Sequence, residues 1–389
     1  MPSRADLDRP LLTPPPRRPW AAAPAGTWAL CDWGLVIGAA GLSVVGALLV
    51  WSSTRSDAGT AYLYRHLLNT ALGMTLAAVV TRMGYQLLRA LAPALYALSV
   101  LGLALVLTPV GSTVNGSHSW ILLPGGFSIQ PSEFAKAALC VGLAIILGER
   151  LDRGAALENR DVALACVVAA VPIGLVMVQP DLGSALVLGA LALGVVALAG
   201  APRRWLAGAA ALVAAGITVA LTTPVLSDYQ RDRLVAFANP QADPQGIGYQ
   251  TRQVRIAIGS GGWQGQGLFD GRQTQGGFIP YQQTDLVFSV AGEELGFIGA
   301  GGLLLLLGFL IVRTVVVAAR ARDAFGRLMA LGVAAWFTFQ VFENVGMNLG
   351  LMPVTGLPLP FVSYGGSSMF ACWLAIGLVN NAHLSAQRR

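Results

Sequence analysis

The sequence predicts an all-α membrane protein that crosses the bilayer many times. Of the 389 residues, 55% are hydrophobic and 11% are charged, whereas a soluble domain carries roughly 25% charged residues. The apolar residues are gathered in long runs, and a run of about 20 residues is enough for a helix to cross the bilayer. The low charge and the long runs together predict about ten transmembrane helices.

The apolar runs give the order of the spans along the chain. They fall at residues 29–51, 66–85, 88–110, 132–148, 162–179, 181–200, 204–226, 286–312, 327–350 and 364–383. Because the fifth and sixth spans almost touch, we expect a sharp turn at Gln179-Pro180-Asp181. A long loop, residues 227–285, connects the seventh and eighth spans. Its aromatic residues and its turn signals predict that it folds over the membrane surface.

The arginines predict how the chain is oriented. All but one of the 25 basic residues are arginines, and they gather in alternate connections, as the positive-inside rule requires when the N-terminus is cytoplasmic. This places both termini inside and loop 227–285 outside. We therefore expect a disordered cytoplasmic tail over residues 1–28, a membrane domain over 29–384 that starts with an uncleaved signal anchor, and a cytoplasmic tail over 385–389.

Composition also excludes several function classes. The arginines lie between apolar spans, which is typical of topology signals and not of a nucleic-acid surface. The few cysteines and histidines lack the spacing of a disulfide framework or a zinc site. The stretch Gly259–Gly267 lacks the strand and helix of a dinucleotide fingerprint, and there is no Walker A motif. Any reaction must therefore be driven by an activated substrate or an ion gradient.

Asp285 is the strongest catalytic candidate. It ends the long polar loop and stands directly before an apolar run. A partly desolvated carboxylate at the membrane boundary can have a raised pKa and take a proton from a bound hydroxyl. The alternative is that Asp285 or Thr284 only caps the helix. Glu293 lies eight residues on, about 12 Å along a helix, so we interpret Glu293 and Glu294 as structural or gating acids.

A second polar group is predicted inside the membrane. Lys136 is the only lysine, and Glu133 lies three residues before it on the same helix face. Isolated charges there cost about 2.5–3.5 kcal/mol on insertion scales, so a pair is favoured. Asp181 opens the sixth span and completes the set. Two interpretations stay open: a polar centre within the bundle, or a local pair beside a helix cap.

The segment around Ser363 and Tyr364 enters the last span after several prolines. Its small residues allow close backbone approach, and irregular backbone at membrane depth usually lines a cavity. A packing hinge is the alternative.

Several segments match a known family in order. They are Gln130–Lys136, Gln179–Leu186, Asn239–Pro244, Gly248–Gln250, Ile256–Gly262, Thr284–Gly299 and Asn344–Ser368. Together they resemble the SEDS family of bacterial shape, elongation, division and sporulation membrane proteins. The resemblance covers nearly all of residues 30–385, and Val354–Pro360 looks closer to the rod-shape branch.

The resemblance implies a peptidoglycan glycosyltransferase that polymerises lipid II at the outer face of the cytoplasmic membrane, with a class B penicillin-binding protein as partner. It maps the essential aspartate onto Asp285, an intramembrane polar trio onto Glu133, Lys136 and Asp181, and a loop arginine onto Arg233. It implies no certain cofactor and leaves a divalent cation, Mg or Mn, open. A lipid-linked precursor flippase and a non-catalytic activator of a penicillin-binding protein are the alternatives.

Three positions depart from the family pattern. Ser119 and Gln266 stand where cations are common in the family, and neither Gln282 nor Gln283 supplies the acid that often precedes the Thr-Asp pair. Two of these changes remove charges that could face pyrophosphate. We therefore expect a less basic site for the leaving group.

Overall fold

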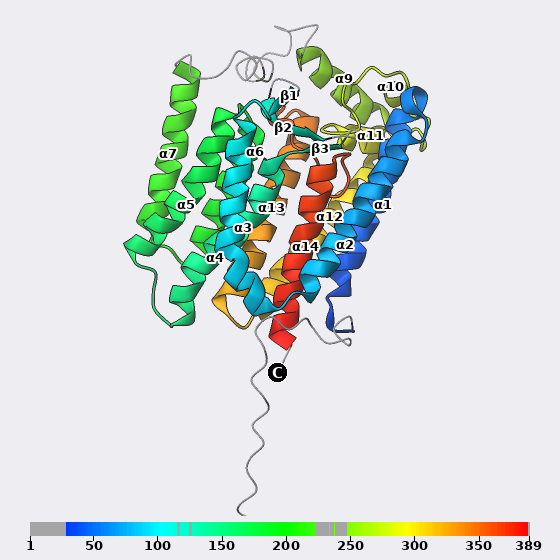
Figure 1. Ribbon diagram of the computed structural model, residues 1–389. Helices are drawn as coiled ribbons and strands as arrows, with labels where there is room; N and C mark the ends of the chain where they lie inside the picture. Colours follow the sequence, from blue (N-terminus) through cyan, green and yellow to red (C-terminus); the bar gives the residue numbers. More distant parts are fainter. Residues whose placement is uncertain are drawn as a thin grey trace, which may run out of the picture.

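The computed structural model describes residues 29–114, 117–123, 127–222, 233, 237 and 247–387. These residues form a bundle of long, roughly parallel helices with a cap of shorter elements at one end (Figure 1). The predicted tail over 1–28, the matched segment Asn239–Pro244 and the last two residues lie outside the described part.

The predicted spans correspond to helices in the same order. They are α1 (Trp33–Ala58), α2 (Ala61–Arg82), α3 (Tyr85–Val106), α4 (Pro131–Asp152), α5 (Asn159–Val178), α6 (Leu182–Leu198), α7 (Arg203–Thr222), α11 (Val287–Glu294), α12 (Gly296–Arg320), α13 (Ala324–Leu349) and α14 (Gly366–Gln387). Among the described residues, six of these helices are long and apolar enough to cross a membrane. The protein is a helical, multi-pass membrane protein, as the sequence predicts.

The eighth predicted span is broken, where the sequence predicted one continuous helix over 286–312. α11 ends at Glu294 and α12 begins at Gly296, which has a φ of +66°. A Cβ at Gly296 would lie 2.2 Å from the backbone nitrogen of Gly265. The loop backbone therefore packs directly against the break, and a contact of such sequence separation leaves no trace in a hydropathy profile.

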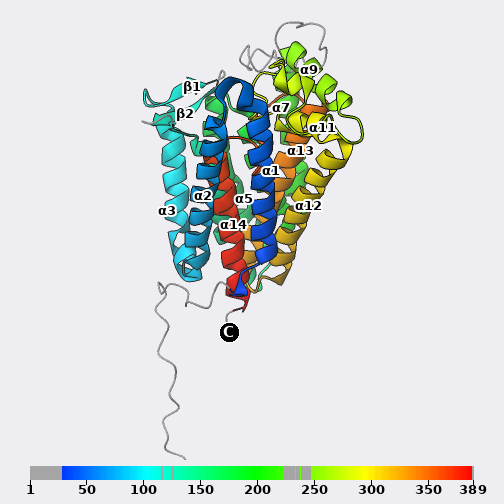
Figure 2. The ribbon, with the colours of Figure 1, turned by 90° about the vertical axis from the view of Figure 1, so that its right-hand side faces the viewer.

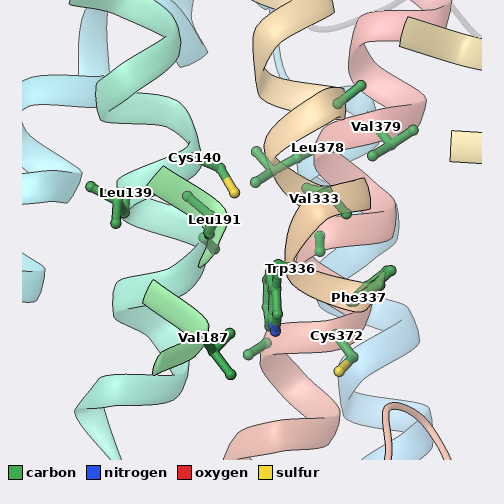
Figure 3. Packing of buried hydrophobic residues seen from close by; sticks show 14 of the residues in the cluster. Leu139, Cys140, Val187, Leu191, Val333, Trp336, Phe337, Cys372, Leu378 and Val379 are labelled. Carbon is green, nitrogen blue, oxygen red and sulfur yellow. The ribbon is translucent and has the colours of Figure 1, made fainter. Parts of the chain in front are cut away.

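α13 forms the centre of the apolar core. Trp336 and Phe337 are almost fully buried, and Figure 3 shows them among the side chains of α4, α6 and α14. Gly332 allows this close approach, because a Cβ there would lie 3.0 Å from the sulfur of Cys140. A rigid central helix of this kind can hold groups at its end in a defined position.

A small sheet lies over one end of the bundle and was not predicted. Its strands are β1 (Ser112–Val114), β2 (Ser117–Leu123) and β3 (Phe127–Ile129), paired antiparallel in the order β1-β2-β3. The pairing sets Ser112 opposite Trp120. Two helices of the long loop, α9 (Ile247–Ser260) and α10 (Arg272–Gln275), lie at the same end (Figures 1 and 2).

Candidate active-site pocket

A cavity of about 170 Å³ with several charged and polar residues on its wall opens at the capped end of the bundle. Its walls come from the sheet, the α5–α6 turn, the segment before α11, and the connection from α13 to α14. The lining residues are Val114, Ser117, Ser119, Trp120, Gln130, Pro180, Asp181, Leu182, Arg233, Thr284, Asp285, Pro353, Val354, Thr355, Gly356, Pro358, Tyr364, Gly365, Ser367 and Ser368. Segments from most of the chain thus meet at one place.

Asp285 lies on this wall and is partly buried. The residue before α11 is Leu286, and no side chain caps that helix, so the helix-cap alternative for Asp285 is wrong. Burial raises the pKa of Asp285 to about 6, and the charge of Asp181 adds to the rise. The positive charge of Arg233 and a hydrogen bond with Thr284 oppose it. Asp285 is therefore a carboxylate that can exchange protons near neutral pH.

Gly356 brings the loop backbone close to both charged groups. With a φ of +79°, it adopts a conformation that favours glycine. A Cβ added at Gly356 would lie 3.5 Å from Asp285 Oδ2 and 3.6 Å from Arg233 Nη1. The carboxylate and the guanidinium therefore face the same stretch of the pocket wall. The sequence carried a signal for this residue in the run of prolines and glycine, Pro353–Pro360.

Asp181 caps a helix, as one of the two interpretations of the sequence predicts. It caps α6, since its carboxylate accepts bonds from the Ser184 backbone nitrogen at 3.0 Å and from Ser184 Oγ at 2.7 Å. It also lies on the pocket wall, where Gln130 Nε2 donates to its Oδ2 at 3.0 Å. Gln130 ends the loop before α4 and was not singled out from the sequence as a wall residue.

Glu133 and Lys136 lie behind the wall. Lys136 Nζ donates to Glu133 Oε1 at 2.7 Å and to Gln340 Oε1 at 3.0 Å. It also lies 5.1 Å from the centre of the Trp336 ring, and its side chain is fully buried. Neither residue is among those that line the pocket, and no hydrogen bond or ion pair within the described residues joins this pair to Asp181. The predicted trio is thus a pair and a separate acid.

Glu293 and Glu294 attach the long loop to the bundle. Glu293 accepts bonds from the backbone nitrogens of Gln273 and Thr274 at the start of α10, at 2.7 and 2.9 Å. Glu294 accepts a bond from Ser52 Oγ on α1 at 2.6 Å. Both acids are buried and lie outside the pocket lining. Their contacts are those of structural acids.

The two positions that lack a family cation have different surroundings. Ser119 is buried on the pocket wall, where it accepts a bond from Ser117 Oγ at 2.9 Å. Gln266 lies away from the wall and bonds within its own loop, to Ser260 Oγ at 2.7 Å and to the Arg272 backbone nitrogen at 3.1 Å. A missing charge can therefore affect the pocket directly only at Ser119.

Ser363 and Tyr364 are adjacent in sequence, but only Tyr364 lines the pocket. Tyr364 lines the pocket, and its backbone nitrogen donates to the Gln283 carbonyl at 2.9 Å. Ser363 is buried, and its Oγ accepts a bond from the Leu359 backbone nitrogen at 2.8 Å. The hydroxyl of Ser363 therefore stabilises the proline-rich turn.

The described residues do not supply a typical metal site. No three His, Cys, Asp or Glu side chains gather as possible ligands within the described ranges. The pocket offers Asp181, which is already hydrogen-bonded, and Asp285. One or two carboxylates can hold a hydrated divalent cation together with substrate phosphates, so a Mg or Mn requirement stays a prediction, and no step of the reaction is assigned to a cation.

The family model and the sequence relatives that match this chain point to one family. A family model described as "cell cycle protein", for FtsW, RodA and SpoVE, matches residues 27–388. A probable peptidoglycan glycosyltransferase FtsW of Trichlorobacter lovleyi is 38% identical over 91% of this chain and 90% of its own. The peptidoglycan glycosyltransferase MrdB of Escherichia coli K12 is 37% identical over 88% and 90%.

Solved structures agree with the sequence relatives. One, from work on the structural coordination of polymerization and crosslinking by a peptidoglycan synthase complex, is 36% identical, with a TM-score of 0.78 over 92% of this chain and 99% of the other. The rod shape determining protein RodA of Thermus thermophilus is 34% identical, with a TM-score of 0.69 over 93% and 100%.

Proposed function

This chain belongs to the family of FtsW, RodA and SpoVE cell cycle proteins, and we propose that Asp285 is the general base of its glycosyl transfer reaction. The protein is a peptidoglycan glycosyltransferase that acts in cell elongation or division. The observation that carries the assignment is the position of Asp285 on the wall of the cavity, with a pKa raised to about 6 and Arg233 facing the same wall.

The substrates we propose are lipid II as acceptor and a growing glycan on undecaprenyl pyrophosphate as donor. Asp285 takes the proton from the 4-hydroxyl of the acceptor GlcNAc as that oxygen attacks C1 of the donor MurNAc. The new glycosidic bond forms as the bond from C1 to the pyrophosphate oxygen breaks, so the anomeric centre inverts. The electron pair leaves with the pyrophosphate, and Asp285 then releases its proton to water.

Arg233 is the group we assign to the leaving pyrophosphate. A guanidinium is always charged and can bind two phosphate oxygens at once. Its place on the wall near Asp285 puts positive charge where negative charge develops during the reaction. Among the described residues that line the pocket, Arg233 is the cation we assign to this role.

We also propose the orientation and the partner. The pocket end faces outward and both termini lie in the cytoplasm, since α4 and α12 carry Arg150 and Arg320 in their last turns, at the end of the bundle opposite the cap (Figure 1). The partner is a class B penicillin-binding protein, because the similar solved chain comes from a complex that couples polymerization to crosslinking.

The test is polymerisation of lipid II by purified Asp285→Asn protein in detergent or liposomes. We expect a loss of about 10²–10⁴-fold in rate, which is the usual contribution of a general base. Arg252→Gln serves as a matched control because Arg252 is exposed on α9, outside the pocket lining. Wild-type rates in Asp285→Asn protein would refute the role.

Thermal unfolding of the same variant separates lost chemistry from lost structure. The pKa of Asp285 is higher in the folded protein than its usual 3.8, so the folded state holds the proton more tightly. Stability therefore falls as pH rises through the window between about 4 and 6. Asp285→Asn removes that unfavourable charge, and its Tm at pH 7.5 is expected to equal or exceed that of the wild type.

A further inference from the structure

Three amide side chains form a row along the C-terminal half of α13. Gln340, Asn344 and Asn348 are spaced four residues apart, so they lie on one face of the helix. None of them has any exposed surface. Buried amides in an apolar bundle are costly unless their hydrogen bonds are made, so the partners of this row decide what it does.

The row donates to main-chain carbonyls of the pocket wall. Gln340 Nε2 donates to the Pro358 carbonyl at 2.8 Å, and Asn344 Nδ2 donates to the Leu357 carbonyl at 2.7 Å. The same Asn344 nitrogen donates to the Asp285 carbonyl at 2.8 Å. One side-chain amide therefore connects the segment that carries the catalytic carboxylate to the proline-rich loop that faces it.

Asn348 extends the row by one turn. Its Nδ2 donates to the Asn344 carbonyl at 2.8 Å and lies 3.3 Å from the Asp285 carbonyl. The Asp285 backbone thus has two amide donors from one rigid helix, and Asn344 makes the shorter bond. The carbonyl and the side chain of Asp285 belong to the same residue, so the bonds that fix the carbonyl also fix where the carboxylate lies in the pocket.

The other end of the row reaches the buried ion pair. Gln340 Oε1 accepts bonds from Lys136 Nζ at 3.0 Å and from Trp336 Nε1 at 2.6 Å. The orientation of the Gln340 amide is set by these two donors, so its nitrogen must point to the Pro358 carbonyl. Lys136 and Glu133 therefore hold one wall of the pocket without lining it.

We propose that Gln340, Asn344 and Asn348 form an amide ladder that positions Asp285 against the opposite pocket wall, with Asn344 as its main positioning residue. The proposal rests on the assignment of Asp285 as the general base. A rigid helix presents the donors, and both walls of the pocket are bound to it. Loss of the Asn344 bonds would let the Asp285 segment and the Leu357 loop move apart, and a misplacement of 1 Å can cost about 100-fold in rate.

The test compares Asn344→Leu with Asn381→Leu. Asn381 is a matched control because it is also a buried asparagine, and its Nδ2 donates to the main-chain carbonyls of Val80 and Met83, both at 2.8 Å. Those carbonyls lie at the end of α2 that is away from the pocket. Both changes remove buried hydrogen bonds of the same kind, so they are expected to lower Tm by similar amounts.

Lipid II polymerisation is then measured for both variants as kcat, KM and the dependence of kcat on pH. Asn344→Leu is expected to lower kcat about 100-fold with KM little changed. The acid limb of its pH profile, where kcat rises with pH, should move to lower pH. The Asp285 side chain in this variant is less well held and better hydrated, so it loses the burial that raises its pKa. Asn381→Leu is expected to keep the wild-type kcat and pH profile.

Two results would overturn the ladder. One is an Asn344→Leu variant with wild-type kcat and pH profile, and the other is an equal fall in kcat for both asparagine variants. Asp285→Asn, measured alongside, distinguishes the causes: if it is inactive while Asn344→Leu behaves like Asn381→Leu, only the ladder fails. If Asp285→Asn keeps full activity, the assignment of the base itself fails.

Discussion

Two acid–base pairs in this bundle differ in how far they are enclosed by the protein. Inside the bundle, Lys136 is fully buried, bonds Glu133 at 2.7 Å, and has Gln340 as a further partner. On the pocket wall, Asp285 is partly exposed, and burial outweighs Arg233, so its pKa is raised to about 6. The enclosed pair stabilises the structure, whereas the partly exposed carboxylate of Asp285 can exchange a proton with solvent or substrate.

The largest effect is expected from breaking the enclosed pair. Lys136→Met leaves the Glu133 charge buried without its partner, which costs about 3–5 kcal/mol of stability. Thermal unfolding and the yield of folded protein in detergent measure the loss. The double variant Glu133→Gln with Lys136→Met is expected to recover most of it, because no uncompensated charge remains. If the double variant were no more stable than Lys136→Met, the pair would not be the cause.

The next effect concerns Arg233, the cation beside Asp285 on the pocket wall. Arg233→Gln is expected to lower kcat by about 10²–10³-fold, as for loss of one group that stabilises a transition-state charge. It should also raise the pKa of Asp285 further, since the guanidinium lowers that pKa in the wild type. The acid limb of the activity profile should move to higher pH. A fall in kcat with an unmoved limb would assign Arg233 to the leaving group alone.

The smallest effect concerns Ser119 and Gln266, the two positions where the family often has a basic residue. Ser119 is buried, but an arginine at this position can extend its guanidinium into the cavity that Ser119 lines. Ser119→Arg is therefore expected to raise kcat/KM by up to about fivefold, since an ion pair in a solvated cavity contributes ~0.2–1 kcal/mol. Gln266→Lys lies off the wall and should leave kcat/KM unchanged. Equal responses of the two variants would contradict the difference in their surroundings.

The sequence predicted the bundle because long apolar runs have few ways to satisfy their backbone except as helices. It did not predict the break before Gly296, because the backbone of Gly265, which packs against the break, lies about thirty residues earlier in the chain. The sheet of β1, β2 and β3 was missed as well, since short strands within a connection carry little periodicity.

The sequence also predicted Asp285 but not the geometry that makes it useful. Asp285, Asp181, Arg233 and Tyr364 all reach one cavity, whereas Glu133 and Lys136 stand behind its wall. Composition and helix spacing place a residue on a face, but they do not say which loop that face meets. The bonds from Asn344 to both walls depend on segments 59 and 13 residues away, and only the folded chain brings them together.

The pH dependence of kcat/KM for lipid II polymerisation by the wild-type protein tests the central claim most directly. Because only the deprotonated carboxylate can accept the proton, activity should rise with pH along a single limb with an apparent pKa of about 6. The residual activity of Asp285→Asn should lack that limb. A wild-type profile that is flat between about pH 5 and 7, or an Asp285→Asn variant that keeps the limb, would contradict the assignment of Asp285 as the general base.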